Sequence, residues 1–345
     1  MGISARTPAR KRRVALIGLN ARAERVLIPG LLAAGNCTLV ALCSRSQAKA
    51  EAMAARFDIP QAFDSVATLI AAGVADTAFI NTPASAHQAP AVAAAQAGMA
   101  VICEKPLAET ATAARAIADA VARAAVPSAV HFTYRGIGGT RMVARLLEAG
   151  TVGRVSLVQV ALLQAKELQG DAPGRSALVE IGSHGLDLCA WWLISAGSAA
   201  DLALERATSM PLPSGAADVT TQAVFRSSAG ALVTLLVSRA AIGFGNGIRA
   251  LVCGDKGSIT LSLDADSALI QQATDGSPWT AREIDDDLQV SYRAFPAVQM
   301  RALVASLEGT RQFPNVSEAL VIQTVQDHVA RQAGLDPASL AAAGR

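Results

Sequence analysis

Long apolar runs and dense charge are both missing from this sequence. No run approaches the roughly 18 residues that a membrane-spanning helix needs. Charged residues make up only 17% of the 345 residues, against 52% hydrophobic ones, which argues against a disordered chain. We therefore expect a compact, soluble protein, long enough for two domains whose cores need no disulfide or metal.

Cysteine and histidine are scarce. The five cysteines are odd in number, show no CxxC spacing and lie mostly in apolar segments, so we expect reduced core residues and neither a disulfide framework nor a zinc site. No serine stands in a G-x-S-x-G turn and no cysteine has an activating helix-start context, which leaves nucleophilic hydrolysis without support. The cysteines are Cys37, Cys43, Cys103, Cys189 and Cys253.

Basic charge is concentrated only at residues 10–13, in a chain whose formal net charge is +2. This cluster has the composition of a nucleic-acid arm or of the charged start of an export signal. However, it abuts the first predicted strand, and the apolar stretch behind it, at 14–19, is too short for the hydrophobic region of a signal. We expect a solvated leader on a cytoplasmic protein that binds neither nucleic acid nor membrane.

The first part of the chain alternates between apolar runs of strand length and helical patterns. This alternation indicates a parallel, doubly wound sheet, that is, a Rossmann-type unit. The predicted strands lie at 13–19, 37–45, 76–83 and 100–106, and the predicted helices at about 21–34, 47–56, 64–72, 86–98 and 108–124.

A glycine-rich phosphate loop would follow the first strand of such a unit, but only the first glycine of a G-x-G-x-x-G pattern is present. The loop reads Gly18, Leu19 and Asn20, and then Ala-Arg-Ala. Asparagine tolerates a left-handed backbone better than other non-glycine residues, and alanine is small enough for a helix to pack on a strand. We therefore expect Gly18, Leu19 and Asn20 to offer backbone N–H groups to a pyrophosphate.

The second strand ends in Ser44 and Arg45, where an NAD-preferring site would have an acidic residue. A hydroxyl beside a guanidinium suits a 2′-phosphate, so these residues favour NADP, with NAD as the alternative. Arg45 could also be an ordinary exposed turn arginine.

Two further strand ends belong to the same edge of the sheet, where ligands of open parallel sheets bind. Proline restricts the residue before it, which would hold Lys105 on a stiff backbone. A surface lysine before a turn proline is the competing interpretation. The residues at this edge, predicted to bind the cofactor, are Asn81, Thr82, Pro83, His87, Glu104 and Lys105.

The segment 178–192 has helical spacing and a single polar stripe. Glu180, His184 and Asp187 fall at i, i+4 and i+7, on one side of an otherwise apolar helix. Ionisable groups on a buried helix cost desolvation energy unless they are paired or functional, so the stripe is a candidate site. His184 could instead be a hydrogen-bonded core residue. Zinc or iron ligation by Glu180 and His184 would need Asp187 or a distant residue as third ligand, and we predict no metal.

The second half predicts a helix at about 139–149, a strand at 155–165, six further strand-like segments and two closing helices. Hairpin signals join several of the strands, so we expect a sheet with one face on the helices and the other available to a partner subunit, in a homodimer or homotetramer. The later strands lie at 202–208, 218–227, 230–239, 247–253, 257–263 and 267–273, and the helices at 294–308 and 316–333.

Four motifs, in this order and spacing, carry a family resemblance. They are N-T-P-x3-H at 81–87, E-K-P at 104–106, the Tyr134–Arg135 pair and E-x-G-x-H-x-x-D at 180–187. Together they resemble the Gfo/Idh/MocA family of NAD(P)-dependent oxidoreductases over residues 12–333. The resemblance implies an α/β protein: a tail at 1–11, a Rossmann domain at 12–130, an α/β domain with a large, mostly antiparallel sheet at 131–333, and a tail at 334–345.

The resemblance implies that Lys105, Glu180 and His184 face the nicotinamide and the substrate. Histidine titrates near neutrality and is the natural acid/base, while a lysine on the same oxygen would stabilise a developing alkoxide. Glu180 would orient His184 or hold a second hydroxyl. We expect substrate contacts from Tyr134, Arg135, Lys166 and Asp187, with helix packing as the alternative for Asp187.

The sequence departs from the family pattern in two segments. Glu180 stands where the family usually has Asp, and Arg175–Ser176 stands where paired glycines are more frequent. The first expectation is an NADP-dependent oxidoreductase acting on a hydroxyl or keto carbon of a sugar, cyclitol or related metabolite. The alternatives are a non-catalytic nucleotide-binding regulator, an NAD-assisted glycoside hydrolase or lyase, and an imine reductase.

Overall fold

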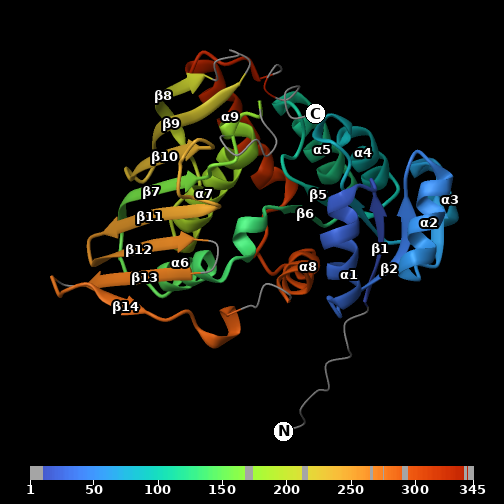
Figure 1. Ribbon diagram of the computed structural model, residues 1–345, viewed down its shortest axis with the longest axis horizontal. Coiled ribbons are helices and arrows are strands. Elements are labelled where there is room, and N and C mark those ends of the chain that lie inside the picture. Colours follow the sequence, from blue (N-terminus) through green and yellow to red (C-terminus); the bar gives the residue numbers. More distant parts are fainter. Residues whose placement is uncertain are drawn as a thin grey trace, which may run out of the picture. The chain divides into compact units, whose positions relative to one another are not determined.

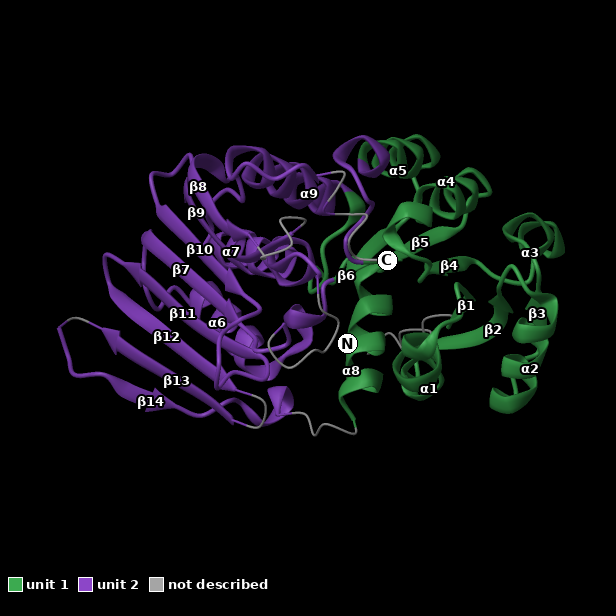
Figure 2. Cartoon of the chain, turned by 45° about the horizontal axis from the view of Figure 1, so that its top comes forward, with its two compact units in different colours: residues 1–104, 115–131, 291–316 green, residues 105–114, 132–290, 317–345 purple. Residues whose placement is uncertain are grey.

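The structure, a computed structural model, describes residues 11–167, 174–211, 217–264, 267–274, 276–289, 294–337 and 340 (Figure 1). The chain forms two compact units, coloured separately in Figure 2. Unit 1 contains residues 1–104, 115–131 and 291–316, and unit 2 contains residues 105–114, 132–290 and 317–345. Among the described residues, no helix combines the length and the apolar character needed to cross a membrane.

Unit 1 contains the expected parallel sheet, with six strands in the order β3-β2-β1-β4-β5-β6. β1 pairs in parallel with both β2 and β4, so the direction of winding reverses there, as in dinucleotide-binding sheets. β3 and β6 were not expected, because runs of three and four residues are too short to show periodicity. The strands are β1 (Arg12–Ile17), β2 (Cys37–Cys43), β3 (Gln61–Phe63), β4 (Thr77–Ile80), β5 (Ala100–Glu104) and β6 (Ser128–His131).

The helices of unit 1 follow local sequence signals. Ser46 and Ser65 cap the helices that they precede, since each side chain accepts a hydrogen bond from the backbone N–H three residues on. The helix expected at 21–34 is α-helical at residues 21 and 22, then π-helical over Ala23–Leu27, and continues as α1 (Ile28–Ala33). The others are α2 (Gln47–Phe57), α3 (Val66–Ala72), η2 (Ala84–Ala86), α4 (Gln88–Gln96), α5 (Ala111–Ala124), which begins in unit 2, and α8 (Phe295–Ser306).

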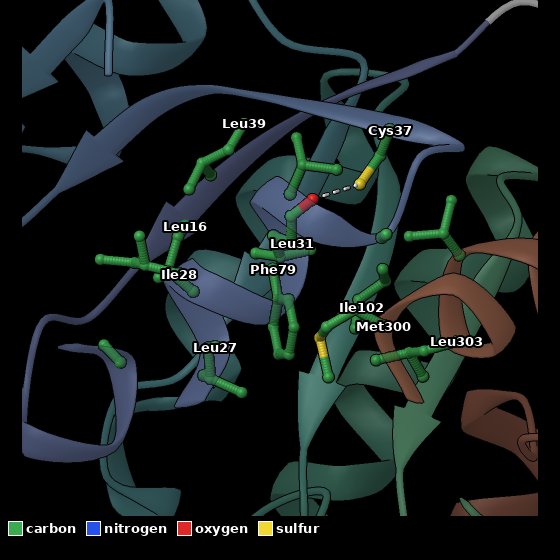
Figure 3. Close-up of a cluster of buried hydrophobic side chains, with 14 of the residues drawn as sticks. Leu16, Leu27, Ile28, Leu31, Cys37, Leu39, Phe79, Ile102, Met300 and Leu303 are labelled. Atoms are coloured by element: carbon green, nitrogen blue, oxygen red, sulfur yellow. Dashed lines mark hydrogen bonds between the residues drawn. The ribbon is translucent and has the colours of Figure 1, made fainter. Parts of the chain in front are cut away.

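Helix α8 belongs to unit 1, although its position in the sequence suggested the second domain. A β-carbon added at Gly30 of α1 would lie 2.9 Å from both Met300 Cγ and Pro296 O, so the two helices touch along their backbones. Figure 3 shows Met300 and Leu303 among the side chains of this core. Close packing of a distant helix cannot be read from local periodicity. The labelled core residues are Leu16, Leu27, Ile28, Leu31, Cys37, Leu39, Phe79, Ile102, Met300 and Leu303.

Unit 2 contains the expected large, mostly antiparallel sheet, with eight strands in the order β14-β13-β12-β11-β7-β10-β9-β8. β7 and β10 pair in parallel, and their other neighbours pair antiparallel. The short β14 was not expected. The strands are β7 (Val155–Leu163), β8 (Ala203–Pro211), β9 (Asp218–Arg226), β10 (Leu232–Ser238), β11 (Gly247–Gly254), β12 (Gly257–Asp264), β13 (Ser267–Thr274) and β14 (Thr280–Arg282).

One face of this sheet carries helices α6 and α7 (Figure 1). The strand register aligns Leu162, Ile248 and Leu263 on that face, and all three are buried. α7 lies directly on β7 and β10, because a β-carbon at Gly185 would meet Leu235 Cδ1 at 2.4 Å. The helices are η3 (Thr133–Gly136), α6 (Gly138–Glu148), the π-helix η4 (Leu178–Gly182), α7 (Ser183–Ser195), η5 (Asp286–Leu288) and α9 (Val316–Gln332).

Candidate functional site

The turn after β1 requires glycine at its first position. Gly18 has a positive φ of +96°, and a β-carbon there would lie 2.6 Å from Thr82 N and 2.7 Å from Asn81 C. Asn81 is buried, and its Nδ2 donates to Gly18 O at 2.9 Å. Glycine is therefore required here for two reasons: its backbone adopts a positive φ, and the turn after β1 packs directly against the backbone at the end of β4.

Asn20 has a different role from the expected one. The non-glycine residues with positive φ in the described chain are Asp58 and Ala125, so the expectation of a left-handed Asn20 is wrong. Instead Asn20 caps the following helix: its Oδ1 accepts from Ala23 N at 2.9 Å and its carbonyl accepts from Glu24 N at 3.1 Å. The side chain thus occupies an N–H group that a pyrophosphate could otherwise bind.

Glu104, at the end of β5, is a buried carboxylate with two basic neighbours. Arg22 Nε and Nη2 each lie 3.1 Å from Glu104 Oε1, and His131 Nδ1 lies 2.7 Å from the same oxygen. Burial acts to raise the pKa of Glu104, but the charges and hydrogen bonds of His131 and Arg22 outweigh it and lower the pKa to about 2. Sequence reasoning missed Arg22 and His131, because β6 gave no strand signal.

The remaining predicted cofactor residues lie at the carboxyl ends of the strands of unit 1. Ser44 is half-buried and Arg45 is exposed beyond β2. His87 is buried, with Nε2 2.7 Å from Thr82 O and Nδ1 3.4 Å from Cys103 Sγ, so it packs inside the unit. Leu19 is also buried, whereas Pro83 is exposed.

In unit 2, Lys105 reaches the start of the helix that carries Glu180 and His184. Its Nζ donates to Glu180 O at 2.9 Å. Glu180 lies in the π-helical turn η4, and His184 follows in the first turn of α7. The expected single α-helix is therefore a π-helix followed by an α-helix, a form that is common at functional sites. Lys105 thus meets the motif at the backbone of Glu180, and His184 follows four residues later on the same helix.

The His184 ring is enclosed by aromatic side chains. It stacks on Tyr134 with centroids 4.3 Å apart and planes 7° apart, and it meets Phe132 edge-on at 5.8 Å. Tyr134 Oη donates to Asn246 Oδ1, which also accepts from Gln164 Nε2 at 2.7 Å. Burial raises the pKa of Tyr134 to about 12, so it remains a hydrogen-bond donor at neutral pH.

Arg135 and Asp187 were expected to contact the substrate, but the structure pairs them with each other. Arg135 Nε and Nη2 donate to the two carboxylate oxygens at 2.8 and 2.7 Å, and the side chains are 4% and 0% exposed. Burial raises the pKa of Asp187, with Arg135 opposing it. This geometry corresponds to the alternative of helix packing. Lys166 is half-buried just beyond β7.

A second buried carboxylate fixes the start of η4. Asp218, at the start of β9, accepts hydrogen bonds from Ser176 Oγ, from Leu178 N at 3.0 Å and from Thr221 Oγ1 at 2.6 Å. It is fully buried and supplies the N-terminal acceptor that the helix needs. Sequence reasoning missed this contact, as it missed Phe132, Gln164 and Asn246, because each depends on chain segments far apart in sequence.

The five cysteines all fall in the described residues and none of them forms a disulfide; four are buried and Cys253 is half-buried. Within the described segments, no three His, Cys, Asp or Glu side chains come together as metal ligands. Asp187, considered from the sequence as a third metal ligand beside Glu180 and His184, is instead paired with Arg135.

A doubly wound parallel sheet and a large, mostly antiparallel sheet define an α/β protein with a Rossmann-type dinucleotide-binding unit and a second α/β unit. Residues 12–132 match a model described as an oxidoreductase family with an NAD-binding Rossmann fold, and residues 140–260 match the GFO/IDH/MocA C-terminal domain. The chain belongs to the GFO/IDH/MocA oxidoreductase family.

Characterised relatives match part of the chain. D-apiose dehydrogenase of Paraburkholderia graminis is 32% identical over 44% of this chain and 41% of its own length. Levoglucosan dehydrogenase of Pseudarthrobacter phenanthrenivorans is 33% identical over 40% of this chain and 38% of its own length. D-glucoside 3-dehydrogenase of Escherichia coli is 27% identical over 51% of this chain and 52% of its own length. The matched region thus spans about two fifths to one half of these relatives.

Solved structures match the whole architecture at lower identity. An oxidoreductase domain protein from Kribbella flavida has a TM-score of 0.80 and 24% identity, covering 94% of this chain and 97% of that one. A levoglucosan dehydrogenase in complex with NADH and levoglucosan has a TM-score of 0.77 and 21% identity, with coverages of 94% and 97%. At these identities the likeness shows a shared fold.

Proposed function

We propose that this protein is a nicotinamide-dinucleotide-dependent oxidoreductase of a sugar, a cyclitol or a related polar metabolite. The observation that carries the proposal is the 2.9 Å contact from Lys105 Nζ to Glu180 O, which brings a lysine to the helix start that carries His184. The dehydrogenases among the relatives act on sugars by their names, which supports the substrate class.

The residues of this helix start suit transfer of hydride to or from a carbon that bears oxygen. When bound, the nicotinamide ring accepts or supplies the hydride. His184 exchanges the proton of the substrate oxygen, since an imidazole changes protonation near neutral pH. Lys105 donates a hydrogen bond to that oxygen and stabilises negative charge on it. Glu180 holds a neighbouring hydroxyl, and the Tyr134 stack keeps the imidazole plane fixed.

The loop of unit 1 fits a dinucleotide. Gly18 lets the turn after β1 pack against the end of β4, and Asn81 fixes the turn through Gly18 O. Gly18, Leu19 and Asn20 would hold the pyrophosphate, with Asn81, Thr82 and Glu104 along the adjoining strand ends. The exposed Arg45 beside Ser44 would bind a 2′-phosphate, so the proposed cofactor is NADP.

Fluorescence titration with NADPH and NADH tests the cofactor. We expect NADPH to bind more tightly than NADH. Arg45→Ala should weaken the affinity for NADPH by about tenfold or more, because a charged hydrogen bond contributes roughly 1.5–3 kcal/mol. The affinity for NADH should change by less than about threefold. Arg123→Ala, which removes an exposed arginine of α5, serves as the control. Equal affinities for NADPH and NADH that do not change in Arg45→Ala would refute the NADP preference and leave NAD as the cofactor.

The capped loop favours a second candidate, a nucleotide-binding regulator without turnover. Asn20 occupies an N–H group at the helix start, which lowers the capacity of the loop for phosphate. Absorbance at the nicotinamide band with a panel of sugars, cyclitols and imines separates the candidates. Dinucleotide binding with no change in absorbance for any substrate would indicate the regulator, and NAD that never leaves the protein would indicate a redox-assisted hydrolase or lyase.

We also propose that the protein is a cytoplasmic homodimer or homotetramer in which the sheet of unit 2 meets a second copy. The face opposite α7 is more exposed; it carries Gln159, Leu251 and Thr260 in register. Light scattering after gel filtration would report the mass, and a monomer would contradict this assembly.

A further inference from the structure

The Tyr134 ring, which stacks on His184, is held at both of its ends. Its backbone carbonyl accepts a hydrogen bond from Thr140 Oγ1, and its hydroxyl donates to Asn246 Oδ1. Tyr134 is 8% exposed and His184 is 4% exposed, so the stack lies inside unit 2. A phenol that is fixed only at its backbone can still turn about its side-chain bonds. The contact at the hydroxyl therefore sets the plane of the ring.

The backbone that carries Tyr134 is docked on the helix that carries His184. Trp192 belongs to the same helix, α7, and its Nε1 donates to Thr140 O at 3.2 Å. Thr140 in turn binds the carbonyl of Tyr134 through its own hydroxyl. The two backbones that carry the stacked rings are therefore fixed relative to each other, and the orientation of the phenol depends on its far end.

Two amide side chains at neighbouring strand ends hold that far end. Asn246 immediately precedes β11, and Gln164 immediately follows β7. These two strands pair antiparallel up to the adjoining residues, Leu163 and Gly247. Gln164 Nε2 donates to Asn246 Oδ1 at 2.7 Å, and the Gln164 backbone N–H donates to Ser238 O, at the end of β10, at 2.8 Å. Three strands thus fix the acceptor of the tyrosine hydroxyl.

These hydrogen bonds also fix the orientation of the Asn246 amide. A carbonyl oxygen has two lone pairs, and here one accepts from Tyr134 and the other from Gln164. Because burial raises the pKa of Tyr134 to about 12, the phenol keeps the proton that it donates. An alanine at position 246 would remove the acceptor of this buried hydroxyl, and the phenol would turn toward another one.

We infer that Asn246 is a positioning residue: through the Tyr134 hydroxyl it keeps the phenol stacked on His184 and so holds the imidazole in one plane. The inference rests on the proposed function only for the chemical role of His184, since the position of the ring can be measured without a substrate. A turned phenol would release one face of the imidazole. A misplacement of about 1 Å in a reacting group can slow the chemistry by about 100-fold.

NMR of the full chain with ¹³C-labelled histidine measures the stack directly. A proton above the face of an aromatic ring resonates upfield, so we expect an upfield His184 signal in the unmodified protein. The spectrum is recorded at about pH 9, where an exposed histidine is neutral. The sequence has four histidines; His184→Gln identifies the signal, and the exposed His328 serves as the reference. Asn246→Ala and Tyr134→Phe should each move the His184 signal downfield.

Three further variants test whether the effect passes through this hydrogen bond. Asn246→Asp keeps an oxygen acceptor for the hydroxyl, so the upfield signal should remain. Asn36→Ala removes another half-buried asparagine, whose Nδ2 donates to Arg301 O at 2.9 Å, and should leave the signal unchanged. The double variant Asn246→Ala/Tyr134→Phe should shift the signal no further than either single variant, because both substitutions remove the same hydrogen bond.

Kinetics with the panel substrate that reacts fastest separate positioning from a direct contact with the substrate. We expect Asn246→Ala to lower kcat by about 10- to 100-fold and to change KM by less than about threefold, because a displaced imidazole affects mainly the reacting geometry. Asn246→Asp should restore kcat to within about threefold of the unmodified value. A raised KM with an unchanged kcat in Asn246→Ala would mean that Asn246 binds the substrate, and would overturn the inference.

The NMR outcomes separate the inference from the proposed function. A His184 signal that moves in Asn246→Ala and returns in Asn246→Asp supports the inference. A signal that stays in place in both Asn246→Ala and Tyr134→Phe overturns it, whether or not the protein turns over a substrate. The expected shifts in a protein that oxidises no member of the panel would keep the positioning of the ring and reject the oxidoreductase.

Discussion

The two helices that contain a π-helical turn near their starts are held there by different chemistry. In unit 1 the cap is Asn20, a neutral amide in the loop that leads into the helix. In unit 2 it is Asp218, a buried carboxylate on β9 about forty residues after the helix start, and the Arg135–Asp187 pair anchors the next turns. Replacing a local neutral cap lowers the free energy of unfolding only slightly, whereas removing one partner of a buried charged contact between two elements lowers it much more. This difference orders the expected effects of mutation.

The Arg135–Asp187 pair should give the largest effect. Arg135→Ala leaves Asp187 buried without its partner, so we expect the free energy of unfolding to fall by about 3–5 kcal/mol. Urea unfolding followed by tryptophan fluorescence measures it, because Trp191 and Trp192 lie on α7. Arg226→Ala breaks an exposed pair with Glu205 and should cost less than about 1 kcal/mol. Equal losses in the two variants would contradict the comparison.

Unit 1 also contains a buried carboxylate, Glu104, whose contribution to stability should depend on pH. Because the pKa of Glu104 is lowered from 4.5 to about 2, its stabilising contribution is complete above about pH 4.5 and is lost as the pH falls toward 2. The loss amounts to roughly 3 kcal/mol. We measure the free energy of unfolding from pH 6 to pH 2. Its decrease on acidification should be smaller in Glu104→Gln than in the unmodified protein by this amount. Glu308→Gln, which removes an exposed glutamate, is the control, and parallel curves for Glu104→Gln and the unmodified protein would refute the prediction.

The cap of η4 should come next. Asp218→Asn keeps one oxygen acceptor but replaces the other with an NH₂ group, which faces hydrogen-bond donors. We therefore expect the free energy of unfolding to fall by about 1–3 kcal/mol. The loss should appear in hydrogen exchange as faster exchange of the amides at 178–182 before the rest of the sheet. Unchanged protection of these amides would show that Asp218 does not hold the helix start.

The smallest effect belongs to Asn20. Asn20→Ala should lower the free energy of unfolding by about 1 kcal/mol. Asn20→Asp should lower it by less, and Asn20→Gly by only a few tenths of a kcal/mol. Glycine would also let a pyrophosphate approach the backbone, so Asn20→Gly should bind NADPH more tightly than the unmodified protein. Thermal unfolding and fluorescence titration read the two effects. Weaker NADPH binding by Asn20→Gly would mean that the asparagine contacts the cofactor directly.

The same division between local and distant contacts explains how far the sequence predicts this molecule. The helix start at Ser46 and the glycine turn at Gly18 follow from local sequence signals. The contact of Lys105 with the helix of Glu180 and His184 agrees with what the family resemblance implies. The Arg135–Asp187 pair does not, because nothing in either segment shows that the two side chains are partners. Asn20 was placed in the right loop with the wrong backbone conformation, since asparagine serves both as a cap and as a left-handed residue.

The most direct test of the central claim is a single-turnover measurement with Lys105→Met. NADP and the substrate that reacts fastest with the unmodified protein are mixed with each protein, and reduced nicotinamide is followed by absorbance. We predict that the rate of hydride transfer falls by about 100-fold or more, as for loss of a donor to a developing oxyanion, while the dinucleotide Kd stays within about threefold. Hydride transfer at the unmodified rate in Lys105→Met would contradict the account.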